Sequence, residues 1–224
     1  MKKITAWSAL FCLFSFSIYG SSIVKNLDSF DEVILSGNVS AMLVEGSEEA
    51  IEIRNDEDRL EFEVEGKSLK VKAKDLIKYN KTPTIKVIIT YRTLRSLRAR
   101  AGASAYSDSP INGDKLELRF SSGAQGEIAI DQESLEVSVS EGGNLKLSGE
   151  TDWQELKVST GGTISAYKLD CQNAIAKATT GGSAKLIAYE SIDANANTGG
   201  SITYKGDPKK VRAKDGFSGT IKGW

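Results

Sequence analysis

Four arginines lie close together in the chain, at Arg92, Arg95, Arg98 and Arg100. Guanidinium groups form paired hydrogen bonds with carboxylate and phosphate oxygens, so this group is a candidate site for anionic glycans or lipid headgroups. Alternating positions share one face of a strand, so we expect Arg98 and Arg100 to project together. The alternative, which stays open, is a solvated basic face balanced by acidic neighbours such as those in residues 45–65.

Aromatic and hydroxyl side chains offer a second kind of binding chemistry. Exposed aromatic rings can stack on sugars, and the candidates are Tyr167, Tyr189 and Tyr204, together with Trp153. Hydroxyl groups that precede or replace glycines could form a row that hydrogen-bonds sugars, or could serve only the turns. These hydroxyls belong to Ser122, Thr160, Thr180, Thr198 and Ser218.

Catalysis is a weaker expectation, because the chain contains no histidine. This excludes histidine-based nucleophile pairs and histidine-containing metal sites. An enzyme would need two carboxylates about 5–9.5 Å apart in a groove, as glycosidases do. The aspartates Asp131, Asp152, Asp170, Asp193 and Asp207 are candidates, but they occur at irregular distances from the glycines. We therefore expect a non-enzymatic protein with no cofactor and no metal; the glycine-rich calcium-binding repeat is also absent.

The N-terminus has the layout of a cleaved export signal. Lys2 and Lys3 precede an apolar run from Ile4 to Ile18, and cleavage after Gly20 or Ser22 fits the requirement for small residues, with Ser22 preferred because Gly20 then lies three positions before the cut. We expect residues 1–22 to be removed and the mature chain to be periplasmic, at the cell surface or secreted in a bacterium. Cys171 is the one cysteine after this segment, so no intrachain disulfide forms and the thiol is expected to be packed as a small apolar residue.

Composition limits the partners. The formal net charge of −1 and pI near 5.8 give no basic field for nucleic acid. No segment after residue 22 is apolar enough to cross a membrane.

Glycines mark an internal repeat that begins near Ala101. A glycine recurs every 18–21 residues, at Gly102, Gly123, Gly142, Gly161, Gly181 and Gly199, with Ser218 at the last equivalent position. Short runs of alternating apolar and polar residues flank each of these positions, which is typical of half-buried strands. Glycine permits a sharp corner with positive φ, and a repeat of this length favours a solenoid. We predict an all-β fold, a parallel β-solenoid of about 19-residue coils. Its interior narrows toward the C-terminus, because later inward positions such as Ala176 and Ala194 are alanines.

Residues 23–100 are predicted to form strands that cap or begin the solenoid within one domain, 23–224. A strand is expected over residues 84–91, one helical turn over residues 56–60, and a hairpin over residues 61–74. In the hairpin, alternate glutamates face alternate lysines across a turn at Gly66, which fixes the register and charges an edge.

The sequence resembles the auto-transporter adhesin head domain, the GIN family of exported bacterial proteins. The resemblance lies in the repeated Ser/Thr-Gly-Gly/Ala-Ser/Thr corner and in two segments that precede it, Asp28–Val33 and Leu94–Leu97. The resemblance covers residues 23–222 and implies a right-handed β-solenoid with a role in cell adhesion. Glu141 and Ala101 interrupt the hydroxyl pattern, and nothing after Trp224 resembles a translocator barrel, so we do not expect the chain to transport itself.

Three hypotheses follow from these residues. The first is a non-enzymatic adhesin that binds a glycan or an envelope or host protein. The second is a carbohydrate-active enzyme of lyase-like shape, and the third is a structural protein that self-associates through its solenoid ends into a homo-oligomer.

Overall fold

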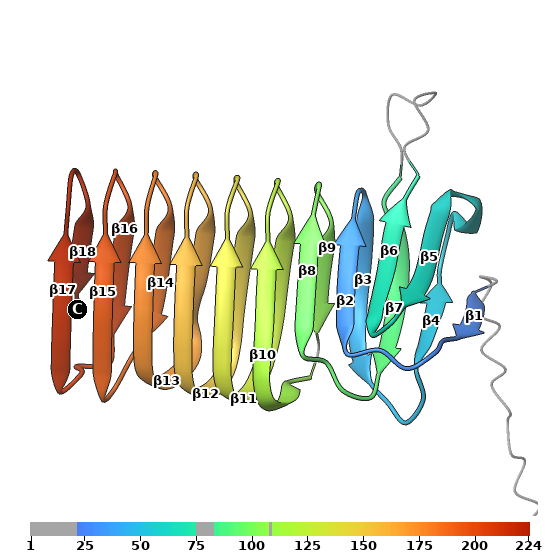
Figure 1. Ribbon diagram of the computed structural model, residues 1–224, viewed down its shortest axis with the longest axis horizontal. Helices are drawn as coiled ribbons and strands as arrows, with labels where there is room; N and C mark the ends of the chain where they lie inside the picture. Colours follow the sequence, from blue (N-terminus) through green and yellow to red (C-terminus); the bar gives the residue numbers. More distant parts are fainter. Residues whose placement is uncertain (1–21, 75–82, 108) are drawn as a thin grey trace, which may run out of the picture.

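The computed structural model of the protein describes residues 22–74, 83–107 and 109–224. Its strands stack into one β-solenoid whose axis is horizontal in Figure 1. Each complete coil rises along a front sheet, turns through a tight corner and descends along a back sheet, and successive coils advance to the left (Figure 1). This path is right-handed, as parallel crossovers almost always are. The predicted fold class is confirmed.

Two sheets face each other across the solenoid. In spatial order along the axis, the front sheet contains β5 (Leu60–Glu65), β6 (Ser68–Ala73), β2 (Glu32–Ser36), β8 (Ser96–Arg100), β10 (Ile111–Phe120), the later halves of β11 (Gln125–Val139), β12 (Asn144–Val158) and β13 (Thr163–Ala178), then β15 (Ser191–Ala196) and β17 (Lys210–Asp215). The back sheet contains β1 (Ile23–Asn26), β4 (Ala50–Ile53), β7 (Ile85–Tyr91), β3 (Val39–Glu45), β9 (Ser104–Ser107), the earlier halves of β11–β13, then β14 (Ser183–Ile187), β16 (Ser201–Lys205) and β18 (Thr220–Gly223). A 3-10 turn, η1 (Glu57–Arg59), joins β4 to β5 where a helical turn was expected.

The core lies between the two sheets, because every second residue of each strand points inward. One inward column of the front sheet shows the predicted narrowing. It runs in register through Phe120, Val139, Val158, Ala178 and Ala196, all of them buried. Burial of each large apolar side chain contributes about 1.5–3 kcal/mol, so the early coils contribute more stability per coil than the late ones.

The six corners from Ala101–Gly102 to Thr198–Gly199 are two-residue turns in which both central residues have positive φ, as in a type I′ turn. At one corner Thr160 has φ 48° and Gly161 has φ 69°, and Gly162 N donates a 2.9 Å hydrogen bond to Ser159 O. Gly161 N also donates to Thr180 O of the next coil, at 3.2 Å. Gly162 is needed for another reason, because a Cβ there would lie 2.8 Å from Val139 O of the preceding coil. The first glycine therefore serves the backbone conformation and the second serves the close stacking of coils.

The N-terminal coil is out of sequence order. The pair β2 and β3 lies between β6–β7 and β8–β9, with parallel pairing on both sides. Gly37, with φ 82°, forms its corner and donates to Arg100 O at 3.3 Å. The Glu32 carboxylate accepts hydrogen bonds from Ser68 on one neighbouring strand and from Ser96, at 3.2 Å, on the other. Glu32 thus holds the inserted strand β2 to both of its neighbours.

The predicted hairpin is confirmed as the antiparallel pair β5 and β6. Glu61 lies opposite Lys72 and Glu63 opposite Lys70. The ion pairs are diagonal: Lys70 contacts Glu65, and Lys74 Nζ lies 3.6 Å from Glu61 Oε1. Within the described part of the chain β5 pairs only with β6, so it forms the charged edge that was predicted.

Cys171 is fully buried, and its thiol donates a 3.1 Å hydrogen bond to Asn173 O. Burial raises its pKa to about 12, which confirms a packed thiol. The predicted export signal lies outside the described residues, apart from Ser22. Across the described ranges, no helix is long and apolar enough to span a membrane.

Candidate binding surface

Outward residues of the front sheet form rows along the solenoid axis, because the coils are stacked in register. From β6 to β17, one row is basic and carries no acidic residue. It runs through Lys70, Ile34, Arg98, Arg119, Ser138, Lys157, Lys177, Asn195 and Lys214. Neighbouring positions are about 4.8 Å apart, which is the spacing of paired strands. The sequence repeat therefore arranges cations in a line.

An acidic row runs beside the basic row, two residues earlier on each strand. Its carboxylates belong to Glu32, Glu117, Glu136, Glu155 and Asp193. Arg98 Nε lies 3.0 Å from Glu32 Oε1, and Lys157 Nζ lies 3.0 Å from Glu155 Oε1. The Lys157 and Lys177 side chains each remain 54% exposed. Exposed pairs of this kind contribute about 0–1 kcal/mol, so the cations remain available to a ligand.

A row of small hydroxyl residues lies on the other side of the basic row, next to the corners. The row begins at Ser36, passes through Arg100, which is its one cation, and continues through Ser121, Ser140, Ser159 and Thr179. We call the basic row and this hydroxyl row together the cation–hydroxyl strip. It combines charge-assisted donors with neutral hydrogen-bonding groups along the axis of the solenoid.

The structure divides the predicted arginine cluster into two pairs. Arg98 and Arg100 project from the outer face of β8 into the cation–hydroxyl strip, since Leu97 and Ala99 between them are buried. Arg92 and Arg95 are exposed in the connection between β7 and β8. They line a cavity of about 230 Å³ that also contains the acidic residues Asp31 and Glu49.

The predicted tyrosines occupy three different settings. Tyr189 is 39% exposed and donates a 2.8 Å hydrogen bond to Asp170 Oδ1, which raises the pKa of Tyr189. The Tyr167 ring lies 4.8 Å from Lys205 Nζ, on a neighbouring part of the back sheet. Tyr204 packs against the core at the inward position after Ile202, in register with buried Leu186. Tyr204 is therefore a core residue of the last coils, and the three rings do not form one stripe.

The corner hydroxyls do line up, with one exception. Ser122, Thr160, Thr180 and Thr198 occupy equivalent positive-φ positions at exposed corners. Ser218 does not join this row, because it takes the place of the glycine, with φ 54°, and Phe217 takes the hydroxyl position. The predicted row is also broken at Glu141, whose carboxylate accepts a 2.6 Å hydrogen bond from Ser122.

The sequence did not predict an acidic ladder at the edge opposite the corners. Asp131, Glu150 and Asp170 are in register on three successive coils and are exposed. A register shift between β12 and β13 adds one residue before Asp170, so Asp170 lies one residue farther from its corner glycine than Asp131 and Glu150 do. Among the residues that the structure describes, no group of three Cys, Asp or Glu side chains is arranged to hold a metal ion.

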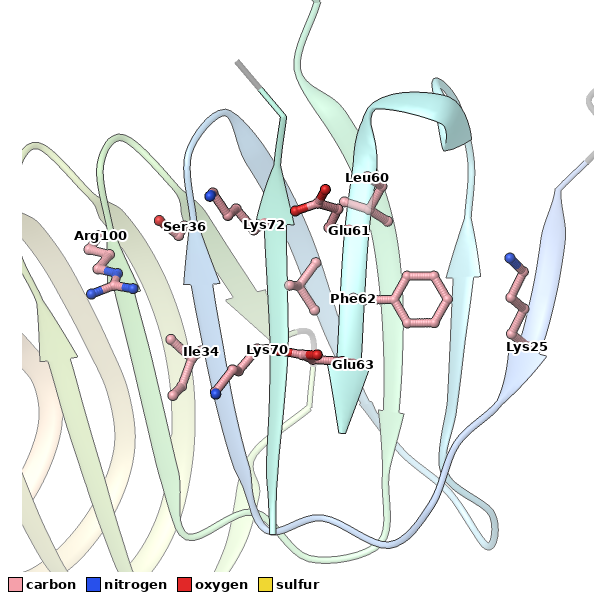
Figure 2. A pocket seen from close by; sticks show the side chains of 11 residues that line it. Lys25, Ile34, Ser36, Leu60, Glu61, Phe62, Glu63, Lys70, Lys72 and Arg100 are labelled. Carbon is pink, nitrogen blue, oxygen red and sulfur yellow. The ribbon is translucent and has the colours of Figure 1, made fainter. Parts of the chain in front are cut away.

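A cavity of about 570 Å³ lies at the N-terminal end of the front sheet (Figure 2). Charged residues of β5 and β6 line it, including Glu61, Glu63, Lys70 and Lys72. Arg100 of the cation–hydroxyl strip lies at its border on β8, as Figure 2 shows. The strip is thus continuous with the charged N-terminal end of the solenoid.

These features define a β-solenoid whose long polar faces repeat with every coil and which lacks a histidine-based catalytic site. The chain belongs to the family described as "Putative auto-transporter adhesin, head GIN domain", whose profile matches residues 29–208. The resemblance noted in the sequence is confirmed.

Solved structures support the same fold. A "putative adhesin" from Bacteroides fragilis is similar with a TM-score of 0.82 and 20% identity, covering 91% of this chain and 96% of that one. A "putative adhesin" from Parabacteroides distasonis gives a TM-score of 0.71 and 19% identity, with 91% and 96% coverage. A "putative lipid binding protein" from the same species gives a TM-score of 0.66 and 21% identity, with 92% and 98% coverage. No curated protein matches the chain in sequence.

Proposed function

We propose that the chain is an exported, non-enzymatic adhesin module that binds an anionic glycan along the cation–hydroxyl strip. The observation that carries this proposal is the basic row, in which Arg98, Arg119, Lys157 and Lys177 project from one face of parallel-paired strands. A polymer with regularly spaced carboxylates or sulfates can contact several cations at once, which multiplies a weak interaction at each coil.

Hydroxyl groups of Ser121, Ser140 and Ser159 lie beside these cations and can hydrogen-bond the uncharged parts of a sugar chain. Membership of the adhesin head family supports a binding role rather than catalysis. The basic and apolar layout of residues 1–22 supports export to the periplasm, the cell surface or the medium, as an export signal would direct.

The test is a glycan array that includes acidic polysaccharides, probed with the mature protein purified from the exported fraction. A strip variant, Arg119→Gln/Lys157→Gln/Lys177→Gln, removes three cations of the basic row. A control variant, Lys146→Gln/Lys168→Gln/Lys185→Gln, removes the same charge from the early half of β12, from β13 and from β14, outside the front sheet. Both variants should retain the unfolding temperature of the parent.

We expect the strip variant to lose at least tenfold in affinity for acidic glycans while the control binds like the parent. Binding should also weaken steeply between about 50 and 500 mM salt, since the Debye length shortens to a few ångströms. Equal losses in both variants would mean unspecific attraction, and binding of no acidic glycan by the parent would refute the proposal.

A further inference from the structure

The C-terminal end of the solenoid exposes two inward positions whose equivalents in the preceding coil are buried. Val211 of β17 is in register with buried Ile192 but is 50% exposed, and Ala213, in register with buried Ala194, is exposed too. Phe217, at the corner that follows β17, is 82% exposed. In the part of the chain that the structure describes, β17 pairs only with β15, so its other backbone edge is open. An open edge beside exposed apolar residues is a template for pairing with another strand.

The N-terminal end exposes an edge of the opposite charge. The outward side chains of β5 are Glu61, Glu63 and Glu65, all exposed. Its inward side chains Phe62 and Val64 are half-buried and pack against the core. By contrast, β17 presents Lys210, Arg212 and Lys214 on its outward side.

Figure 2 shows how the N-terminal end is filled. Phe62 projects past β5 toward Lys25 of β1, whose Nζ lies 5.3 Å from the ring centroid. Lys25 Nζ is also 2.7 Å from Glu57 Oε1. The N-terminal end is thus a mixed surface made of the Phe62 ring, the Lys25 side chain and the open backbone edge of β5. No strand of the described ranges other than β6 pairs with β5.

We propose that two copies of this chain join head to tail, with β17 of one copy paired antiparallel to β5 of the next. Because β5 is antiparallel to β6 and β17 is parallel to β15, this join continues the front sheet with its outer face unchanged. The proposal is independent of the glycan proposed above.

One register satisfies every position of the join. If Glu63 lies opposite Arg212, then Glu61 lies opposite Lys214 and Glu65 opposite Lys210, all on the outer face. On the inner face, Phe62 then meets Ala213 and Val64 meets Val211. A slip of one residue would put glutamates against apolar residues.

Charge also selects the partner edge. Pairing of β5 with β5 would place glutamates against glutamates, and pairing of β17 with β17 would place lysines against lysines; both are unfavourable. In the head-to-tail join the outer charges alternate: Lys70, then Glu63, then Arg212, then Asp193, whose Oδ2 already lies 3.5 Å from Arg212 Nη1. The contact is heterologous, so it repeats and builds a filament rather than a closed dimer.

The test begins with the mass of the purified mature protein, measured by sedimentation from micromolar to millimolar concentration at about 50 mM salt. We expect growth without a fixed limit, filaments in electron micrographs, and a shift to monomer at about 1 M salt, where charge pairs are screened. A variant, Lys210→Glu/Lys214→Glu, faces Ser191 and Asn195 within its own copy and should fold normally. It should raise the concentration needed for half-assembly at least tenfold. The matched control, Lys146→Glu/Lys185→Glu, should not.

Cross-linking then tests the register itself. A Val64→Cys copy mixed with a Val211→Cys copy should form a disulfide-linked dimer on mild oxidation, because opposite Cβ atoms are about 4.5–5.5 Å apart. Each copy alone should stay unlinked through these positions, and Val64→Cys mixed with Lys209→Cys should link poorly. A parent that remains monomeric, an oligomer of fixed size, or linking of equal yield in all mixtures would overturn the proposal.

Discussion

Gly126 occupies an inward position of β11 at which the neighbouring strands carry Ala105 and Leu145. A Cβ built on Gly126 would lie 2.6 Å from Phe120 Cε1 and 2.7 Å from Leu145 Cδ1. The ring of Phe120 therefore fills the space that a side chain would take at this position. Gly126→Ala should destabilise the protein by about 1–3 kcal/mol through overpacking. For a chain of this size, that corresponds to a fall of about 2–12 °C in unfolding temperature.

A second substitution should relieve the first. Phe120→Leu removes part of the ring and should cost about 1 kcal/mol alone, through lost burial and a small cavity. In the double variant the methyl group introduced at position 126 occupies the space that the ring has left. We expect the double variant to be more stable than the sum of the single changes predicts, by about 1 kcal/mol or more.

Urea denaturation of the parent, the two single variants and the double variant measures this coupling energy. A control cycle combines Phe120→Leu with Leu69→Ala. Leu69 is a buried residue of β6, three strands from β10, which places it about 14 Å from Phe120 at ordinary strand spacing. The control pair should be additive within about 0.5 kcal/mol. Additivity in the Phe120 and Gly126 cycle, or a neutral Gly126→Ala, would refute the packing argument.

Three other predictions concern single positions. Thr180→Asn should stabilise the protein by up to about 1 kcal/mol in thermal unfolding, because Thr180 has φ 49° and asparagine tolerates that conformation better than a β-branched residue. A loss of stability would contradict the idea that Thr180 is strained at this corner. Cys171 should resist thiol reagents at pH 7 in the folded protein, since its pKa is about 12, and rapid labelling would contradict this. Cys171→Thr should keep the parent unfolding temperature, because Thr151 occupies the same position one coil earlier and its hydroxyl donates to Trp153 O at 3.1 Å. The hydrogen bond from Lys115 lowers the pKa of Glu136 below 4.5, so the Glu136 carboxylate stabilises the fold above pH 4.5 and loses this contribution as the pH falls through its native pKa. Glu136→Gln should therefore cost a few tenths of a kcal/mol of unfolding free energy at pH 7 and nothing at pH 2. An equal cost at both pH values in urea titrations would refute this linkage.

The coil repeat and the strand positions could be predicted because they follow from local residue types. Corner glycines and alternating runs dictate the turn and the inward face, whatever surrounds them. The basic row carried a signal as well. Arg98, Arg119, Lys157, Lys177 and Lys214 each precede an aligned corner position by four residues, so aligning the repeats would have revealed the row.

Other features could not be predicted because they depend on partners distant in sequence. Ser36-Gly37-Asn38 resembles the later corners, but nothing local indicates that β2 pairs with β8 rather than with the strand that follows it. The register shift before Asp170 is similar, since one extra residue in β13 is visible only when β12 lies beside it.

The insertion of β2–β3 has a consequence for how the chain folds as it emerges during synthesis. Ordinary coils join residues about one repeat apart, as Ser122 and Glu141 do at a separation of 19, whereas Glu32 and Ser96 are separated by 64. Closing the longer segment costs about 1 kcal/mol more in chain entropy. The inserted coil can pair with β6 and β7 on one side first. Its other side must wait until β8 and β9 have emerged, while each later coil can add to an existing edge as soon as it appears. The side of residues 32–45 that faces β8 and β9 therefore stays open for a longer interval than the edges of later coils, and this interval is when a holding chaperone or a protease has access to it.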